Sequence, residues 1–455
     1  MTLPSRRLRS LVLSAASAAA LLAAAPASAE TLTEALAEAY TTNPQLLAER
    51  ARLRATDEEL SQANAGWRPT VIINGDAGKS QDYENDISGD SWSADITASQ
   101  PIFEGGAVGA RRDIAKAQIR AGRASLRGVE GGVLLGAVTA YMNVVRDLST
   151  VELSRRQVEV LERERQASQD RFDVGEITRT DVSQAEARLS GARTSLIGAE
   201  AQLEASRAAY IRVIGHAPAN LQSSPSLPAL PKSLEDAITE AMALNPALVA
   251  AREQQLASQA GIDLAVSGLL PTVSLTGRYT IGETNSDAIL STNRDTEAGS
   301  IGLGARVPLY QGGAEYSAIR QAKQTNNQNR MTAAQTEREA VEDVTNAWEG
   351  LAAARAAIKS AEDQVRASEI AYEGVRQEAE VGARTTLDVL NAEQELLNAR
   401  VTLITNQRNE YVAAYALLAA MGRLTAGDLA LPVEVYDPVP HADDVAGKLI
   451  GVGDE

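Results

Sequence analysis

The side chains that could carry acid–base or metal chemistry are sparse in this chain. His216 and His441 are its only histidines, and it contains no cysteine. Neither histidine lies near a suitably spaced nucleophile or second ligand, so Ser/His/Asp catalysis and a histidine metal site have little support. The stretch GLGARV at 302–307 lacks the spacing of a dinucleotide-binding loop. We therefore expect neither enzyme activity nor a cofactor.

The first 29 residues predict export. Three arginines precede an apolar run, 11–25, and Ala27-Ser28-Ala29 has the small-x-small pattern of a signal peptidase site, so the mature chain is expected to begin near Glu30. Losing those arginines takes the formal charge from −17 to −20, which argues against nucleic acid or an anionic lipid surface as a partner. No later stretch approaches the ~20 apolar residues of a spanning helix, so a membrane crossing would have to use strands.

An internal repeat sets the domain organisation. LTEALAEAYTTNPQL from Leu32 returns as LEDAITEAMALNPAL from Leu234, at an offset of 202 residues. After two matching prolines the offset becomes 207, and PIFEGG returns at that distance as PLYQGG. The length difference predicts a hairpin with a surface turn. We expect a first repeat at 30–217 with a hairpin at 70–103, a linker at 218–232, a second repeat at 233–431 with a hairpin at 272–310, and an acidic, irregular tail at 432–455.

The hairpins show strand periodicity. Between Thr272 and Ile281 and again between Ser300 and Val307, apolar and polar residues alternate, and Thr70–Gly78 is the least regular of the four strands. Such strands fit a half-buried sheet of a soluble domain or a membrane barrel, and no separate apolar helix is left over to cover a sheet. Four strands cannot close alone, whereas three copies would supply about twelve.

Between the hairpins the chain is expected to be helical. Neither 103–216 nor 310–430 contains proline, so each predicts a helix of roughly 65 residues, a tight turn and a shorter returning helix with coiled-coil spacing. At 1.5 Å per residue the long helix would reach about 100 Å. The PIFEGG and PLYQGG motifs would form the strand-to-helix turns, in which proline ends the strand and Gly-Gly opens the helix. Their residues are Pro101, Gly105, Gly106, Pro308, Gly312 and Gly313.

Taken together, the signal peptide, the paired Asn-Pro elements, the two Gly-Gly turns and the duplicated order of elements resemble the TolC-type outer-membrane channel-tunnel family, over residues 30 to about 430. The resemblance implies a mainly α fold with a β-barrel part: a duplicated coiled-coil tunnel in the periplasm, and four membrane strands per chain that complete a 12-stranded barrel in a homotrimer. It implies a passive exit duct of a tripartite efflux pump or a type I secretion system in the outer membrane of a Gram-negative bacterium. Its partners would be outer-membrane lipid, a periplasmic adaptor and an inner-membrane ABC or RND-type transporter.

The resemblance also implies a gate at the turns between long and short helices. Asp388 would line the periplasmic constriction, where three symmetry-related carboxylates would concentrate cations. Arg384 would link to Thr180 and Asp181 of the neighbouring coil. Two departures are Asn391, in place of a second ring aspartate, and Ala379, in place of a latching tyrosine. Gly175 and Gly382 would mark the adaptor-docking tips.

Two alternatives stay open at the level of sequence. Asp181, spaced with Gln184, resembles a capping box, and Asp388 also lies at a helix start, so both aspartates fit plain helix capping. A periplasmic coiled-coil adaptor or scaffold would share the signal peptide and the long helices, but it would not need four two-faced strands of membrane length.

Overall fold

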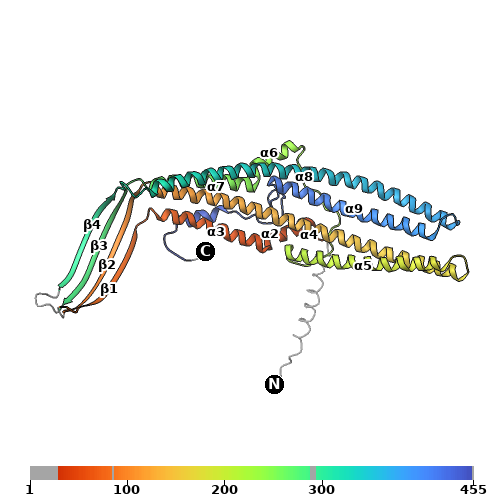
Figure 1. The fold of residues 1–455 in the computed structure, drawn as a ribbon, viewed down its shortest axis with the longest axis horizontal. Helices are drawn as coiled ribbons and strands as arrows, with labels where there is room; N and C mark the ends of the chain where they lie inside the picture. Colours follow the sequence, from red (N-terminus) through yellow and green to blue (C-terminus); the bar gives the residue numbers. More distant parts are fainter. Residues whose placement is uncertain (1–28, 85–86, 287–293, 453–455) are drawn as a thin grey trace, which may run out of the picture. The chain divides into compact units, whose positions relative to one another are not determined.

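A computed structural model describes residues 29–84, 87–286 and 294–452. The predicted signal peptide lies outside these residues. The structure repeats the same elements in the same order (Figure 1), and each helix of the first repeat has a partner of equal length in the second. The pairs are α2 (Leu32–Thr42) and α6 (Leu234–Leu244), α3 (Pro44–Ala65) and α7 (Pro246–Ser267), α4 (Ala107–Asp173) and α8 (Ala314–Glu380), and α5 (Arg179–Ile214) and α9 (Thr386–Met421).

The long helices agree with the length predicted from the proline-free stretches. Both α4 and α8 contain 67 residues, and both returning helices contain 36. Along α5 the predicted coiled-coil positions Val182, Ala185, Leu189 and Leu203 are buried. Their 3,4 spacing keeps them on one face of the helix, which explains why that face packs against its neighbours.

The two hairpins combine into one antiparallel sheet. Strands β1 (Thr70–Asp82), β2 (Ile87–Glu104), β3 (Thr272–Ser286) and β4 (Arg294–Arg306) lie side by side in chain order. Strand β2 is hydrogen-bonded to β3, so the sheet joins the two repeats. The tip of the second hairpin, with the extra length expected there, lies outside the described residues. Among the described residues, β1 and β4 each have a neighbour on one side only, so the sheet is open.

The strand register sorts the sheet into an apolar and a polar face. Directly paired residues share a face, and Ile73, Ile96 and Tyr279 form one row across β1, β2 and β3. The adjacent row, on the opposite face, contains Thr97 and Arg278. The irregular sequence of β1 is thereby explained, because Val71 and Ile73 fall on the apolar face and only Ile72 falls on the polar one.

The Gly-Gly turns lead from the sheet into α4 and α8. Gly105, Gly106, Gly312 and Gly313 have φ of 59°, 86°, 70° and 86°, a left-handed conformation that favours glycine. A Cβ on Gly105 would also lie 2.8 Å from both the Ser267 carbonyl oxygen and the Leu270 Cβ. The expected role of Pro101 is wrong, because β2 continues to Glu104 through a bulge between Pro101 and Phe103. Bulges accommodate proline within a strand. Pro308 does follow the end of β4.

The chain forms two compact units that do not follow the repeats. Of the described residues, one comprises 29–47, 129–241 and 341–435, and the other 48–128, 242–340 and 436–452. Each unit draws on both repeats. The sheet, most of α3 and residues 436–452 belong to the second unit, whereas the turns between long and short helices belong to the first.

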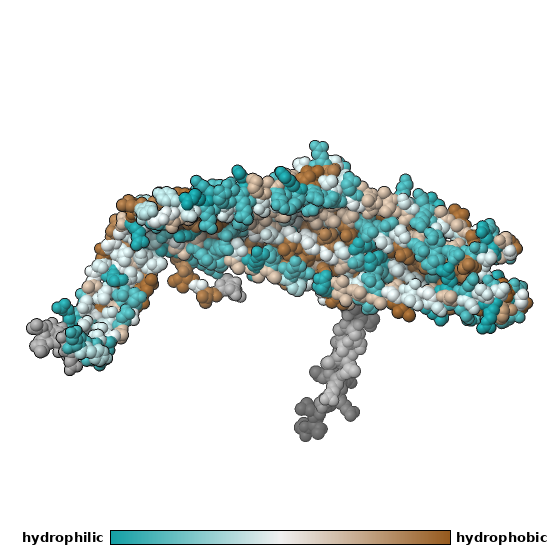
Figure 2. All heavy atoms as spheres, viewed as in Figure 1, coloured by the Kyte–Doolittle hydropathy of each residue, from teal (hydrophilic) through white to brown (hydrophobic). Residues whose placement is uncertain are grey.

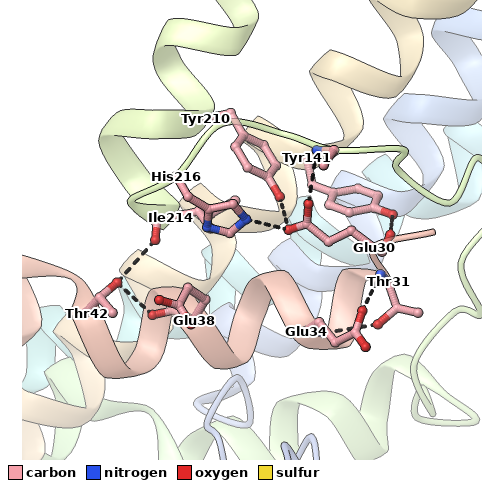
Figure 3. A network of polar contacts seen from close by, with 10 residues as sticks. Glu30, Thr31, Glu34, Glu38, Thr42, Tyr141, Tyr210, Ile214 and His216 are labelled. Carbon is pink, nitrogen blue, oxygen red and sulfur yellow. Dashed lines mark hydrogen bonds and ion pairs between the residues drawn. The ribbon is translucent and has the colours of Figure 1, made fainter. Parts of the chain in front are cut away.

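A polar network fixes the start of the described chain in the first unit (Figure 3). The Glu30 backbone pairs with Asn220 and Gln222, and its carbonyl accepts a 2.8 Å hydrogen bond from the Tyr141 hydroxyl. Its carboxylate accepts from the Tyr210 hydroxyl and lies 3.1 Å from Nε2 of His216. The first residue of the expected mature chain is therefore a structural anchor, and His216 has a packing role here.

Helix α4 requires one correction to the sequence analysis. Among the described residues it is the one helix with an 18-residue window long and apolar enough to pass as a membrane span, although none was expected. Half of that window is buried inside the protein, and Tyr141, Val144 and Leu134 of α4 are fully buried. Packing against neighbouring helices accounts for this apolar stretch.

The C-terminal segment is more ordered than its composition predicted. It contains a short helix, α10 (Val439–Ala446), with Ala442 and Val445 buried. The expectation of an irregular tail fails because these two small apolar residues, three positions apart, face the same side of a helix.

Candidate functional site

The turns between long and short helices have the same backbone geometry in both repeats. Gly175 and Gly382 have φ of 80° and 76°. After each glycine, a backbone N–H reaches back to the end of the long helix: Glu176 donates to Arg171, and Ala383 to Glu378, both at 2.9 Å. These are the bonds of a helix C-cap with glycine in the left-handed region. Each tip is thus a tight, exposed reversal.

A capping box starts each returning helix. Thr178 and Asp181 form the box of α5, and Thr385 and Asp388 form that of α9. The Asp388 carboxylate accepts from the Thr385 backbone N–H at 3.0 Å and from its hydroxyl at 2.8 Å. The backbone bond is the main reason that the pKa of Asp388 lies below its usual value, whereas at Asp181 the Thr178 hydroxyl contributes most. Both carboxylates are therefore charged at neutral pH.

Capping is what the structure shows for these aspartates, with one change of partner. The predicted pairing of Asp181 with Gln184 is wrong, because Asp181 is the third residue of the helix and its box partner is Thr178, before the helix. Capping occupies one oxygen of Asp388 and leaves its side chain partly exposed. Its role in lining a pore stays a prediction.

Within one chain, Arg384 does not meet the predicted linking partners. Its Nε donates to Glu378 on the same hairpin at 2.8 Å. Asp181 serves its own cap, and Thr180 is exposed on the first turn of α5. A link from Arg384 to Thr180 and Asp181 would require another copy of the chain. That link stays a prediction.

The two helical hairpins are joined instead through Asn391. Its side-chain oxygen accepts a 2.6 Å hydrogen bond from Nη2 of Arg188, which connects α9 to α5. Val158 and Leu161 of α4, Leu189 of α5 and Leu390 of α9 form an apolar cluster in the same helices. Asn391, which the family resemblance predicts at a ring position, therefore makes a contact within the chain.

A buried carboxyl group on α9 was missed by the sequence analysis. Glu393 is only 7% exposed, and burial raises its pKa to about 7, although a hydrogen bond with Gln157 acts in the other direction. A signal was present in the sequence: the apolar stripe Leu387, Leu390, Leu397, Val401 skips one helical turn, and Glu393 falls in that turn.

Glu393 lines a cleft of about 800 Å³ between α4, α8 and α9. Leu396, Leu397 and Leu403 form part of its apolar wall. Two ion pairs contribute to the lining, Arg156 with Glu152 at 2.8 Å and Arg400 with Glu369 at 2.6 Å. Since these neighbouring charges already have partners, the cleft offers Glu393 no free cation among its lining residues.

Comparison with known proteins shows which proteins this chain is similar to. A family model described as "Outer membrane efflux protein" matches residues 35–216 and 237–423. The outer membrane efflux protein BepC of Brucella suis biovar 1 is 34% identical over 426 residues, which cover 93% of this chain and 92% of BepC. The outer membrane protein TolC of Vibrio cholerae is 27% identical over 88% of this chain and 92% of its own. The solved structure of the Campylobacter jejuni CmeC outer membrane channel shares the fold, with a TM-score of 0.76 and 17% identity over 91% of this chain and 89% of CmeC.

Proposed function

Because this chain belongs to the outer membrane efflux protein family, we propose that three copies of it form the exit duct of an efflux system. The protein is an outer-membrane channel of this family, with its helical part in the periplasm, and not a periplasmic adaptor. The proposal concerns what the family alone leaves open: the number of copies, the partners, the cargo and the gate.

The open sheet is the observation that supports assembly of three copies. It has one apolar face, four strands and two edges without a neighbour in the chain. A sheet edge cannot remain open in lipid, because its N–H and C=O groups would lack partners. Copies must therefore share one barrel, and three copies give about twelve strands, an even number within the range of bacterial barrels.

The helices suit a duct that reaches across the periplasm. Each 67-residue helix extends about 100 Å, and its tip reverses at an exposed glycine, Gly175 or Gly382. We assign these tips to docking of a periplasmic adaptor, which connects the duct to an inner-membrane ABC or RND-type transporter. Small molecules are the favoured cargo over secreted proteins, because BepC, which is 34% identical over 93% of this chain, is named an efflux protein.

Asp388 is our candidate for the gate. Its position at the start of α9, three residues from the tip turn, would bring three copies close to a common axis. The carboxylate is charged at neutral pH and partly exposed, so a ring of three would attract cations and repel anions. Asn391, one turn further along α9, adds no charge, so the constriction depends on this single ring.

The first experiment tests the duct. Outer-membrane fractions should contain heat-modifiable material of trimer size that resists alkaline and urea washing. Cells that lack the chain should accumulate an efflux dye and recover on complementation. Recovery of the protein with soluble periplasm would defeat the proposal, and a defect in protein secretion with unchanged dye efflux would assign the duct to type I secretion.

The second experiment tests the gate residue in planar bilayers. Asp388→Ala should lower the preference of the channel for cations, because it removes three charges from the constriction. Asp363→Ala is the matched control, since Asp363 is an exposed acid on α8 that pairs with Arg366, one turn away at 3.1 Å. An unchanged cation preference in Asp388→Ala would show that this side chain does not face the pore.

A further inference from the structure

The end of the chain runs along α3 as a strap. We use "C-terminal strap" for residues 436–448 and "apolar tail" for residues 449–452. The Tyr436 ring lies 5.2 Å from the guanidinium of Arg50, and His441 Nδ1 lies 3.0 Å from Oδ2 of Asp57, which is fully buried. Successive contacts advance along both segments, so the strap runs parallel to α3 and toward the sheet.

Two further hydrogen bonds bring the strap to the start of β1. Asn64 donates to the Ala446 carbonyl at 3.1 Å, and Arg68 Nη1 donates to the Lys448 carbonyl at 2.7 Å. Arg68 lies two residues before Thr70, the first residue of β1. The strap is therefore held at several points along about 20 Å of helix, and its last held residue is at the foot of the sheet.

The apolar tail leaves this point without packing against the protein. Leu449, Ile450 and Val452 are 76%, 97% and 103% exposed. In Figure 1 the short helix α10 lies beside α3, and Figure 2 shows a small group of hydrophobic atoms near it, standing away from the helices. Exposing three large aliphatic side chains to water is energetically unfavourable, so we expect the tail to be buried against another molecule.

The surroundings of the tail identify lipid as that cover. Trp67 and Phe103, both more than 40% exposed, lie at the foot of β1 and β2, where the Gln100 side chain bonds the Trp67 carbonyl at 2.9 Å. Exposed aromatic residues at strand ends are typical of the membrane–water interface. Arg68 and Lys448 add positive charge beside the tail, which suits anionic headgroups. The apolar face of β1 begins at Val71, 63% exposed.

We propose that the apolar tail inserts into the periplasmic leaflet of the outer membrane at the foot of β1, and that the C-terminal strap holds it there. The inference goes beyond the duct, although it rests on the sheet spanning the membrane. In this proposal, phospholipid covers the apolar tail. The competing possibility is that a neighbouring copy of the chain covers it.

The test uses the absence of native cysteine. Single variants Ile450→Cys, Asp443→Cys and Ile301→Cys carry an environment-sensitive fluorophore in the full-length protein, reconstituted in vesicles of phosphatidylethanolamine and phosphatidylglycerol. Asp443 is on the exposed side of α10 and reports water. Ile301, 84% exposed on the apolar face of β4, reports whether the sheet is in lipid.

We expect spin-labelled lipid to quench the labels at 450 and 301, and iodide to quench the label at 443. Arg68→Ala should lower lipid quenching at 450 several-fold and leave it unchanged at 301. Iodide quenching of the label at 450, together with lipid quenching of the label at 301, would overturn the tail proposal and leave the proposed barrel unaffected. Protection of the label at 450 from both quenchers would overturn the tail proposal and indicate that a neighbouring copy covers the tail. Unchanged lipid quenching at 450 in Arg68→Ala would show that the strap contact at Arg68 does not hold the tail in place. Loss of lipid quenching at 301 would contradict the proposed barrel instead.

Discussion

The protonation state of the Glu393 carboxyl group should affect how stably α9 packs against α4. The neutral form is favoured by burial, so its pKa lies near 7 rather than 4.5 in the folded protein. The stabilisation that this implies is fully present below the unfolded pKa and is lost as pH rises through about 7. The difference between the folded and the unfolded pKa of Glu393 corresponds to about 3 kcal/mol of folding stability at most.

We expect Glu393→Gln to stabilise the protein relative to the native chain at pH 8, and to do so less at pH 6. Thermal unfolding in detergent at both pH values measures this, with exposed Glu395→Gln as the control on the same helix. An equal effect of Glu393→Gln at both pH values would mean that Glu393 does not titrate in this range. The polar groups that face it or line its cleft are Gln157, Glu164, Tyr372, Glu152, Arg156, Glu369, Glu373 and Arg400.

Asn391 should control how firmly the two helical hairpins hold together. Asn391→Ala removes the 2.6 Å bond from Arg188, at a cost of about 1 kcal/mol, and should raise single-channel conductance by loosening the tips. Asn391→Asp would convert this hydrogen bond into an ion pair with Arg188, which should hold the tips more firmly and lower conductance. Arg188→Ala combined with Asn391→Ala should add little to either single change. Additive effects in this double variant would contradict a direct coupling.

At the scale of elements, the Gly-Gly turn connects a membrane strand to a long helix, and its two glycines are constrained differently. Gly105→Ala would introduce both a positive φ penalty and contacts of 2.8 Å with Ser267 and Leu270, whereas a Cβ on Gly106 would meet nothing within 4 Å. We expect Gly106→Ala to cost about 1 kcal/mol, and Gly105→Ala to cost clearly more. The fraction of heat-modifiable protein after refolding measures both, and equal losses would contradict the steric account.

The elements were predictable where one local rule dominates. Each long proline-free stretch permits a long helix and a shorter returning one, and α4 and α8 have the expected length. Alternation predicted the strands, and pairing with β2 was needed to place the irregular β1. The continuation of β2 past Pro101 depends on a bulge that β3 accommodates, so a rule about proline alone could not predict it.

The candidate site was less accessible to sequence reasoning, because its contacts join distant segments. The cap at Asp388 is local and was foreseen as an alternative, but Arg188 and Asn391 are 203 residues apart. Glu393 is charged in isolation and becomes buried only when α4 and α8 pack around it. Arg384 has acidic neighbours six and four residues away in Glu378 and Asp388, and they compete with any link to another hairpin.

At the scale of the whole molecule, the proposed barrel would close between copies, and the absence of cysteine makes this testable. In the sheet order β1-β2-β3-β4, the edge strands of one chain are three inter-strand spacings apart, about 14 Å. A disulfide requires Cα atoms within about 7 Å. A cysteine on β1 therefore cannot bond with one on β4 of the same chain, but it can bond with β4 of the next.

We expect Ile301→Cys to form disulfides with Val71→Cys, Ile73→Cys or Gly75→Cys when each β1 variant is combined with it in one chain. All four positions lie on the apolar face by register, and the three β1 positions scan the unknown offset between copies. Oxidation in native membranes, followed by denaturing electrophoresis, should convert at least one pair into covalent trimers with no larger species, because a closed ring of three leaves no free edge. Each single variant is the control for its pair. A ladder beyond three chains would indicate an open assembly, and monomers at every β1 position would show that these edges do not meet.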